Sequence, residues 1–156
     1  MKLKIAVLPG DGIGPEVTDQ SIKVLNCVAD KYNHKVEISE GLVGATAIDQ
    51  YNDPYPDSTH KICKDSDAIL FGAIGDPKYD NNPKAKIRPE QGLLKMRKKL
   101  GLFANLRPTI IFESLLDLSP IKQERIKGTD ILFVRELTGG ISVSYTHLRA
   151  HETKAN

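Results

Sequence analysis

The sequence contains no tryptophan, only two cysteines, and no apolar run long enough to cross a membrane. Cys27 and Cys63 stand alone, without the paired spacing of a zinc site, so we expect reduced thiols and a cytoplasmic protein. The N-terminal stretch MKLKIAVLPG lacks a signal-peptide cleavage pattern. These features argue against a membrane protein and against a secreted, disulfide-rich protein.

Acidic residues are scarce in one part of the chain. Between Lys78 and Arg107 there are nine basic residues and only two acidic ones, Asp80 and Glu90, although the net charge of the whole chain is only +2. The stretch has few aromatic residues and no known nucleic-acid-binding motif, so a nucleic-acid partner is not expected. The local excess of positive charge favours an anionic small molecule.

What is present is ordinary globular composition. The chain has 156 residues, of which 40% are hydrophobic and 27% charged, enough for a buried core. Leu3–Leu8 reads as a buried strand, followed by a glycine loop at Gly10–Pro15 and a helix beginning at Pro15. The apolar face predicted for this helix consists of Val17, Val24, Leu25, Val28 and Tyr32.

The order of strand, glycine turn and helix predicts an α/β fold, an open sheet flanked by helices. The glycine spacing is G-x-G-x-G-P, so it does not match the G-x-G-x-x-G dinucleotide fingerprint, and no Walker lysine follows. A tight turn with close backbone approach explains the glycines as well as a phosphate cradle does. Ala68–Ile74 is predicted to be a second buried strand, and further strands are predicted at Lys35–Ser39, Phe103–Phe112 and Ile131–Val134.

Helices are expected at Val43–Tyr51 and Pro56–Lys64, with His60 exposed on a surface turn, and Leu115–Lys127 is expected to mix turn and helix. Gly75–Arg88 is too polar and too rich in proline for regular structure. A long polar loop after a strand suits a ligand-binding loop of an open α/β sheet, and a disordered surface loop explains it equally well.

A helix is also predicted at Glu90–Leu100, entered through Arg88 and Pro89. At about 100° per residue, Leu93, Met96 and Leu100 form an apolar stripe. The residues expected to face water are Gln91, Lys95, Lys98 and Lys99. The adjoining face carries Glu90, Leu93, Leu94 and Arg97.

Two interpretations of Arg97 are open. It either lies at the rim and covers apolar surface with its stem, or it joins Arg107 and Arg135 in a binding site. A guanidinium binds a carboxylate through two parallel hydrogen bonds. Three arginines beside Leu93 and Leu94 would suit a small di-acid that carries a branched apolar group.

The stretch after Ile141 loses the apolar pattern of the rest of the chain. His147 and His151 have the i, i+4 spacing of two metal ligands on a helix, but only Glu152 is near as a third, and the H-E-x-x-H order is absent. We therefore predict no metal ligand in this chain and interpret residues 142–156 as foreign or unstructured sequence.

Several motifs occur in order: VLPGDGIGPEV, GAIGDPKYD, KIRPEQGLLKMRKKLGLFANLRP, LSPIK and VRELTGGI. They resemble the isopropylmalate dehydrogenases of leucine biosynthesis, within the wider β-decarboxylating dehydrogenase family, and the resemblance runs from Met1 to Ile141. In isopropylmalate enzymes the two leucines of the RPEQGLL motif receive the isopropyl group, whereas isocitrate enzymes tend to carry a polar residue at this place. Leu93 and Leu94 therefore favour isopropylmalate.

The resemblance implies that Arg97, Arg107 and Arg135 bind the substrate carboxylates. It also implies an oxidoreductase that transfers hydride from C2 to NAD and then releases the β-carboxylate as carbon dioxide, with Mg or Mn as Lewis acid, and that forms a homodimer. Glu90 is expected near the nicotinamide. The other residues implied at the cofactor are Ile13, Asp76, Pro77, Lys78, Tyr79, Asp80, Asn81, Asn82, Pro83, Lys84, Ala85, Lys86, Ile87, Arg88 and Pro89.

The sequence departs from the family at one informative position, because Ser142 stands where the family has a tyrosine that assists protonation. The family's catalytic lysine and metal-binding aspartates are expected beyond this chain, so no catalytic set is complete here and we expect this chain alone to be inactive. We expect residues 1–101 to form the N-terminal part of a first domain and residues 102–141 to form the start of a second, with residues 142–156 as a tail. The alternatives are a homoisocitrate, tartrate/malate or isocitrate enzyme, or a non-catalytic anion-binding module.

Overall fold

A computed structural model describes residues 1–80 and 86–137. The chain divides into two compact units, Met1–Leu100 and Gly101–Asn156. The predicted tail, residues 142–156, lies outside the described residues. None of the described helices is long and apolar enough to cross a membrane.

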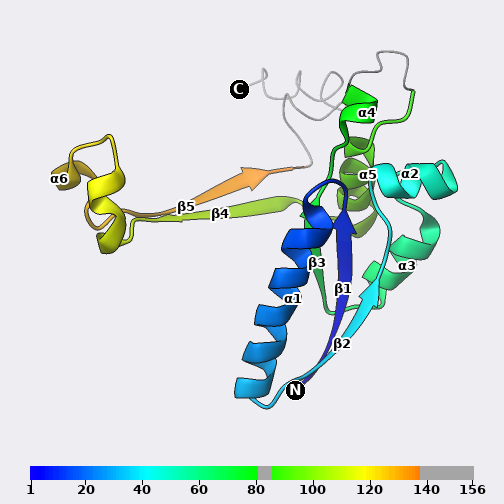
Figure 1. Cartoon of the computed structure of the whole chain (residues 1–156), viewed down its shortest axis with the longest axis horizontal. Coiled ribbons are helices and arrows are strands. Elements are labelled where there is room, and N and C mark those ends of the chain that lie inside the picture. The colour runs from blue at the N-terminus through cyan, green and yellow to red at the C-terminus, as the bar shows by residue number, and fades with distance from the viewer. Residues whose placement is uncertain (81–85, 138–156) are drawn as a thin grey trace, which may run out of the picture. The chain divides into compact units, whose positions relative to one another are not determined.

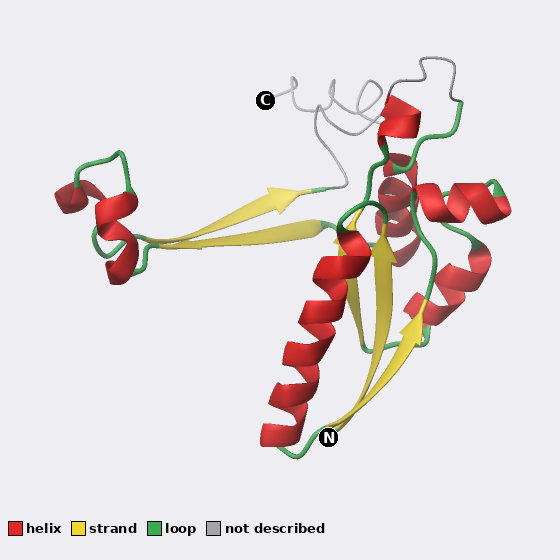
Figure 2. Cartoon of the chain, in the orientation of Figure 1, coloured by secondary structure: helices red, strands yellow, loops and turns green. Residues whose placement is uncertain are grey.

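The first unit is built on a three-stranded parallel sheet in the order β2-β1-β3 (Figures 1 and 2). The strands are β1 (Lys2–Gly10), β2 (Lys35–Glu40) and β3 (Ala68–Ala73), so all three predicted strands are confirmed. β1 pairs with both neighbours, and its residues Ile5–Leu8 are buried. This central position explains the continuous apolar run, because a parallel strand is covered on both faces.

Helices lie on both sides of this sheet (Figure 1). α1 (Gly14–Lys31) packs on one face, and α3 (Asp57–Lys64) and α5 (Glu90–Leu100) pack on the other. A short helix, α2 (Ala45–Tyr51), precedes α3 in the chain. The α/β prediction is therefore confirmed. The core between the sheet and α3 and α5 contains Ala6, Leu8, Val43, Tyr55, Cys63 and Met96.

Two predictions about burial are wrong. The predicted apolar face of α1 is largely exposed: Val24 is 64% exposed and Val28 47%, while Thr18 and Ala29 are buried. α1 packs on the sheet through a stripe that contains the buried Gly14, Thr18 and Ala29 and the half-buried Ile22 and Leu25. β3 was also expected to be fully buried, yet its residues are only half-buried beyond the exposed Ala68.

The segment Gly75–Arg88 is not wholly irregular, because it contains a single helical turn, α4 (Pro77–Asp80). The side chains of Lys78 and Tyr79 both contact Asp49 of α2. This tertiary anchor stabilises a turn that local sequence composition does not favour.

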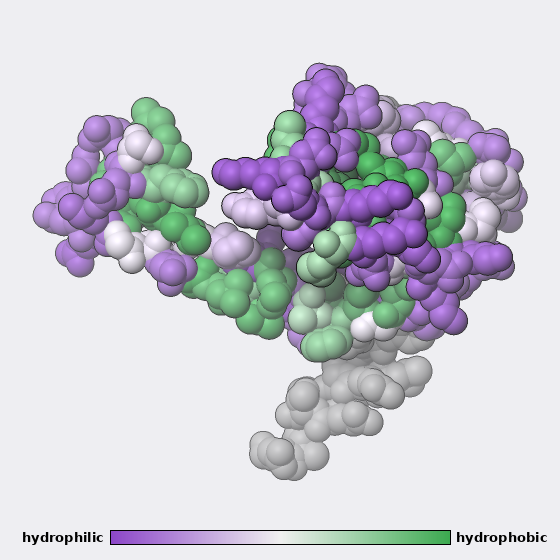
Figure 3. All heavy atoms as spheres, turned by 90° about the horizontal axis from the view of Figure 1, so that it is seen from below, coloured by the Kyte–Doolittle hydropathy of each residue, from purple (hydrophilic) through white to green (hydrophobic). Residues whose placement is uncertain are grey.

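The second unit contains the two predicted strands, β4 (Ala104–Ile110) and β5 (Asp130–Glu136), which pair antiparallel. The connection contains a 3-10 helix, η1 (Glu113–Leu118), and α6 (Gln123–Ile126), which matches the expected mixture of turn and helix. Side chains of both strands are exposed on both faces, with Leu106, Leu132 and Val134 on one face and Ile131 and Phe133 on the other. Figure 3 shows apolar surface open to solvent on the side that it draws.

Candidate functional site

The buried side chain of Asp11 forms hydrogen bonds with two segments at the carboxyl edge of the parallel sheet. Asp11 follows β1 and is 3% exposed. Its carboxylate accepts the N–H groups of Ala45 (2.8 Å), Thr46 (3.0 Å) and Gly75 (3.1 Å). The first two belong to the N-terminus of α2, and the third belongs to the loop after β3. Asp11 therefore caps a helix across a gap in the sequence and fixes two loops at once.

The glycines around Asp11 are required by close approach. Gly10 has φ +78°, and a Cβ there would overlap the carbonyl oxygen of Ala73. Gly44 has φ +80°, and a Cβ there would overlap the carboxylate of Asp11. Positive φ and lack of space both favour glycine at these positions. Close backbone approach therefore accounts for Gly10, as the sequence analysis allowed.

Three segments that the sequence analysis assigned to the cofactor lie near one another. A Cβ built on Gly12 would lie 3.8 Å from the carbonyl oxygen of Gly75, and one built on Gly75 would lie 3.8 Å from Oε1 of Glu90. Ile13, next to Gly12, is 57% exposed. The structure thus groups the β1–α1 loop, the start of the β3–α4 loop and the first residue of α5 at one edge of the sheet, where open α/β sheets bind ligands.

Two further predicted cofactor residues are engaged elsewhere. Lys78 Nζ lies 2.5 Å from Oδ1 of Asp49, and the hydroxyl of Tyr79 donates to the same oxygen at 3.0 Å. The hydrogen bond from Lys78, followed by that from Tyr79, lowers the pKa of Asp49, and the same contact raises the pKa of Lys78. Any role of Lys78 at a cofactor has to be compatible with this ion pair.

The remaining predicted cofactor residues are only partly described. Lys86 is exposed, Ile87 and Arg88 are half-buried, and Pro89 is buried. The N–H of Arg88 donates to Oε1 of Gln91 at 3.2 Å, while the N–H of Gln91 donates to the carbonyl of Arg88, and this reciprocal pair starts α5. The predicted residues outside the described part of the chain are Asn81, Asn82, Pro83, Lys84 and Ala85.

α5 has the predicted bounds and most of the predicted faces. Met96 is buried, and Leu93 and Leu100 pack against the core. Leu94 is 45% exposed, Glu90 is exposed, and Arg97 is half-buried. Leu94, Glu90 and Arg97 therefore remain available for a ligand, whereas Leu93 is shared with the core.

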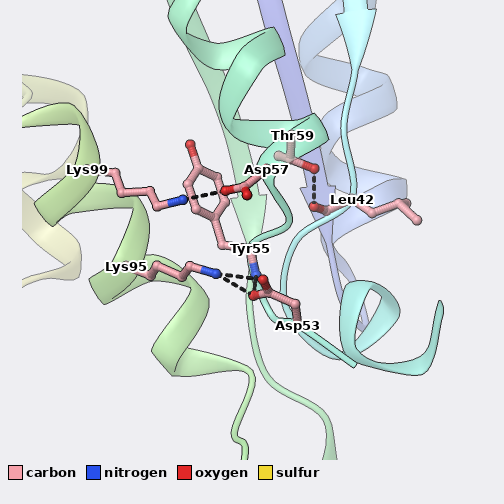
Figure 4. Close-up of polar contacts among 7 residues, drawn as sticks. All are labelled: Leu42, Asp53, Tyr55, Asp57, Thr59, Lys95 and Lys99. Atoms are coloured by element: carbon pink, nitrogen blue, oxygen red, sulfur yellow. Dashed lines mark hydrogen bonds and ion pairs between the residues drawn. The ribbon is translucent and has the colours of Figure 1, made fainter. Parts of the chain in front are cut away.

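Lys95 is half-buried and does not simply face water as expected, whereas Lys99 is exposed; both form ion pairs that the sequence analysis did not predict. Nζ of Lys95 lies 2.8 Å from Oδ1 and 2.6 Å from Oδ2 of Asp53, and Nζ of Lys99 lies 2.5 Å from Oδ1 of Asp57 (Figure 4). Asp53 comes from the segment that joins α2 to α3, and Asp57 is the first residue of α3. No local pattern signals pairs formed across 42 residues.

His60 is not on an exposed turn, as the sequence suggested, but half-buried on α3. Its ring lies edge-on to Tyr55, with 5.8 Å between centroids, and Nδ1 is 3.3 Å from the tyrosine hydroxyl. Burial, followed by a hydrogen bond with Cys63, raises the pKa of Tyr55 well above its usual range. Tyr55 is therefore a neutral phenol in the core.

In the second unit, the register of the two strands places two of the predicted arginines on one face. Asn105 is opposite Arg135, and Arg107 is opposite Phe133. Alternate residues of a strand share a face, so Arg107 and Arg135 are diagonal neighbours, about 7–8 Å apart by typical sheet geometry. Arg97 belongs to the first unit, and the convergence of all three arginines stays a prediction.

The described residues contain no group of three or more histidine, cysteine, aspartate or glutamate side chains that could hold a metal ion. His147, His151 and Glu152 lie outside the described part of the chain.

Comparison with known proteins identifies the family of this arrangement. The family model described as isocitrate/isopropylmalate dehydrogenase matches residues 4–156. The chain belongs to this family. The match includes the segment after Ile141, whereas the alignments to the curated relatives described below cover 140 or 141 residues, so the foreign origin of residues 142–156 stays a prediction.

Curated relatives named 3-isopropylmalate dehydrogenase are close in sequence. Those of Bacteroides fragilis and Bacillus subtilis are each 55% identical over 141 residues, and that of Aquifex aeolicus is 55% identical over 140 residues. In each case the alignment covers 90% of this chain. The chain spans 38–40% of the length of these relatives.

Solved structures share the fold. The isocitrate dehydrogenase of Methylococcus capsulatus matches with a TM-score of 0.66 and 25% identity, covering 92% of this chain and 40% of that chain. A β-decarboxylating dehydrogenase of Thermococcus kodakarensis matches with a TM-score of 0.61 and 31% identity, covering 87% and 34% respectively. The oxidoreductase family predicted from the motifs is therefore confirmed.

Proposed function

We propose that this chain supplies the substrate-binding helix and part of the cofactor edge of an NAD-dependent 3-isopropylmalate dehydrogenase. The observation that carries the proposal is the face of α5 on which Leu94 and Leu93 lie beside Arg97, at the edge where Ile13, Gly75 and Glu90 meet. A branched apolar group on a di-acid needs this combination of leucine and guanidinium. The names of the relatives support the choice.

In this proposal Arg97, Arg107 and Arg135 bind carboxylates in two-pronged contacts. Leu93 and Leu94 receive the isopropyl group, and Glu90 lies at the nicotinamide. Bound NAD would supply the hydride acceptor for C2. The C2 hydroxyl proton would be lost, and the β-carboxylate would leave as carbon dioxide before a proton adds at C3 to give 2-oxoisocaproate.

Gly12 and Gly75, at φ +57° and +136°, leave backbone open beside the exposed Ile13, where a flat ring such as a nicotinamide can approach. We propose that NAD binds at this edge. We also propose that Mg or Mn is held by residues outside this chain, where the resemblance places the metal-binding aspartates of the family. We further propose a homodimeric cytoplasmic enzyme of leucine biosynthesis.

The proposal is tested by joining residues 1–141 to the remainder of the Bacillus subtilis relative and assaying NAD reduction. We expect turnover with 3-isopropylmalate and Mg or Mn that exceeds turnover with isocitrate or malate, and none from the 156-residue chain alone. A hybrid that prefers isocitrate or malate would favour another member of the family. A folded hybrid without turnover on any of these substrates would favour the non-catalytic module.

The arginines give the residue-level test in the same hybrid. Replacing Arg97, Arg107 or Arg135 with lysine keeps the charge but removes the paired hydrogen bonds. Each change should cost about 1.5–3 kcal/mol of transition-state stabilisation. The value of kcat/KM for 3-isopropylmalate should therefore fall roughly ten- to more than a hundred-fold. The matched control is Arg125→Lys on α6, which should change little. Near-parental kinetics in Arg97→Lys would return Arg97 to the rim interpretation.

A further inference from the structure

The side of α5 that faces away from Arg97 is held by two ion pairs. Lys95 and Lys99 are one helical turn apart, so they lie on the same face. Their partners are also four residues apart: Asp53 lies in the segment that joins α2 to α3, and Asp57 is the first residue of α3 (Figure 4). We call these four residues the double ion pair.

The helix and the segment are also in close backbone contact near the two pairs. A Cβ built on Gly92, three residues before Lys95, would overlap the carbonyl oxygen of Pro54, so only glycine allows this approach. That carbonyl is itself fixed, because it accepts the N–H of Gly44 at 2.9 Å. Tyr55 and Met96 are buried in the same core cluster. The contact therefore combines close backbone approach and apolar packing with two charged pairs.

The side chain of Asp53 is oriented by a backbone hydrogen bond in addition to its contact with Lys95. Its Oδ1 accepts the N–H of Tyr55 at 3.0 Å, which holds the carboxylate in a turn. The side chains of Lys95 and Asp53 are 35% and 34% exposed, and both carboxylate oxygens contact the ammonium. Asp57 is 88% exposed, so the pair with Lys99 is the weaker of the two.

Helical geometry relates this contact to the proposed ligand face. At about 100° per residue, Lys99 and Gly92 lie nearly opposite Glu90 and Arg97. A contact on one side of a rigid helix sets the rotation of the other side. Small displacements of a binding group weaken catalysis strongly.

From this geometry, and resting on the proposed function, we infer that Asp53, Asp57, Lys95 and Lys99 are positioning residues that set the rotation of α5 and thereby aim Arg97 and Leu94 at the substrate. These residues touch no substrate themselves. They act through the helix, so their loss should affect the recognition of the isopropyl group more than the chemistry common to all substrates.

The first test uses the 156-residue chain and hydrogen exchange. In Lys95→Met/Lys99→Met, which keeps the apolar stems, protection of the Met96–Leu100 amides should fall by about tenfold, while protection in α1 stays unchanged. Lys61→Met, at an exposed position of α3, is the matched control. Unchanged protection in the double variant overturns the inference.

The second test uses the hybrid enzyme and compares 3-isopropylmalate with malate, which lacks the isopropyl group. The double variant should lower the ratio of kcat/KM for the two substrates by about fivefold, mainly through a higher KM for 3-isopropylmalate. A variant that is merely less folded lowers both activities equally and leaves the ratio unchanged, and this result would also overturn the inference. The variant Asp53→Lys/Lys95→Asp keeps an ion pair at this position with the charges exchanged. Its ratio of kcat/KM for the two substrates should therefore lie closer to the parent value than the ratio of Lys95→Met/Lys99→Met does.

The two proposals fail in different ways. A parent hybrid without turnover counts against the proposed function, and hydrogen exchange in the chain still decides whether the double ion pair holds α5. If the parent hybrid is active and the double variant has the same ratio of kcat/KM for the two substrates, the proposed function stands and the positioning role is wrong.

Discussion

Asp11 shows how a single side chain can organise the edge of a sheet. Its carboxylate is buried and accepts three backbone N–H groups from two segments that are distant in sequence. Two of these donors are the free N–H groups at the start of α2, where a negative charge also meets the positive end of the helix dipole. The same bonds hold Gly75 beside Glu90, so the residue connects folding to the proposed cofactor edge.

We expect Asp11→Ala to destabilise the first unit by about 3 kcal/mol or more, because three buried or half-buried donors lose a charged acceptor. Urea unfolding followed by circular dichroism measures the difference. Asp19→Ala, at an exposed position of α1, serves as the control and should change stability by less than about 0.5 kcal/mol. An Asp11→Ala variant as stable as that control would show that water replaces the carboxylate.

At the scale of elements, local patterns predicted the strands and helices well. The run at Leu3–Leu8 is apolar because β1 is the central strand, and the run at Ala68–Ile74 forms β3, which pairs with β1. The proline at the start and the helical period together located α5 at its observed bounds. The failures all depend on partners distant in sequence. Asp49 stabilises α4, and Asp53 and Asp57 engage the lysines of α5.

The candidate site was predictable to the same extent. Helical period places Leu93, Leu94 and Arg97 on one side of α5, whereas the shared face of Arg107 and Arg135 depends on a strand register that the sequence does not provide. The role of Asp11 does not follow from a local pattern either, because a capping residue normally lies next to its helix in sequence. An acidic residue inside a glycine loop was the available signal.

The pairing of Asp53 with Lys95 should make the stability of the first unit depend on pH. Burial raises the pKa of Asp53, but the hydrogen bonds from Lys95 and Tyr55 outweigh it and leave the pKa below its ordinary value. A lowered pKa means that the carboxylate stabilises the fold above the unfolded pKa, about 4, and that this stabilisation is lost as pH falls through the folded pKa.

We expect urea unfolding between pH 7 and pH 3 to show a steeper loss of stability in the parent than in Asp53→Asn. The difference should stay within roughly 1 kcal/mol, because the pair is about one-third exposed and solvent screens it. Asp65→Asn, at an exposed position after α3, is the control and should follow the parent. Parallel curves for the parent and Asp53→Asn would show that the pair is lost in solution.

At the scale of the whole molecule, each unit presents apolar side chains to solvent. On α1 these include Val17, Val24 and Val28, and on the antiparallel pair they include Leu106, Leu132 and Val134, each more than 40% exposed. Exposed apolar patches of this kind mark contact surfaces or promote aggregation. The structure locates much of this surface on α1 and on β4 and β5.

We therefore expect the 156-residue chain to bind a hydrophobic dye such as anilinonaphthalene sulfonate and to elute from a sizing column as more than a monomer. Because the outer stripe of α1 contributes no core contact that its replacement would break, Val17→Lys/Val24→Lys/Val28→Lys should lower dye binding and keep the helical circular dichroism signal. Gln20→Lys/Asn26→Lys adds charge at exposed polar positions of the same helix and should leave dye binding unchanged. A parent chain that is a monodisperse monomer, melts sharply and binds no dye would mean that these side chains find apolar cover within the chain itself.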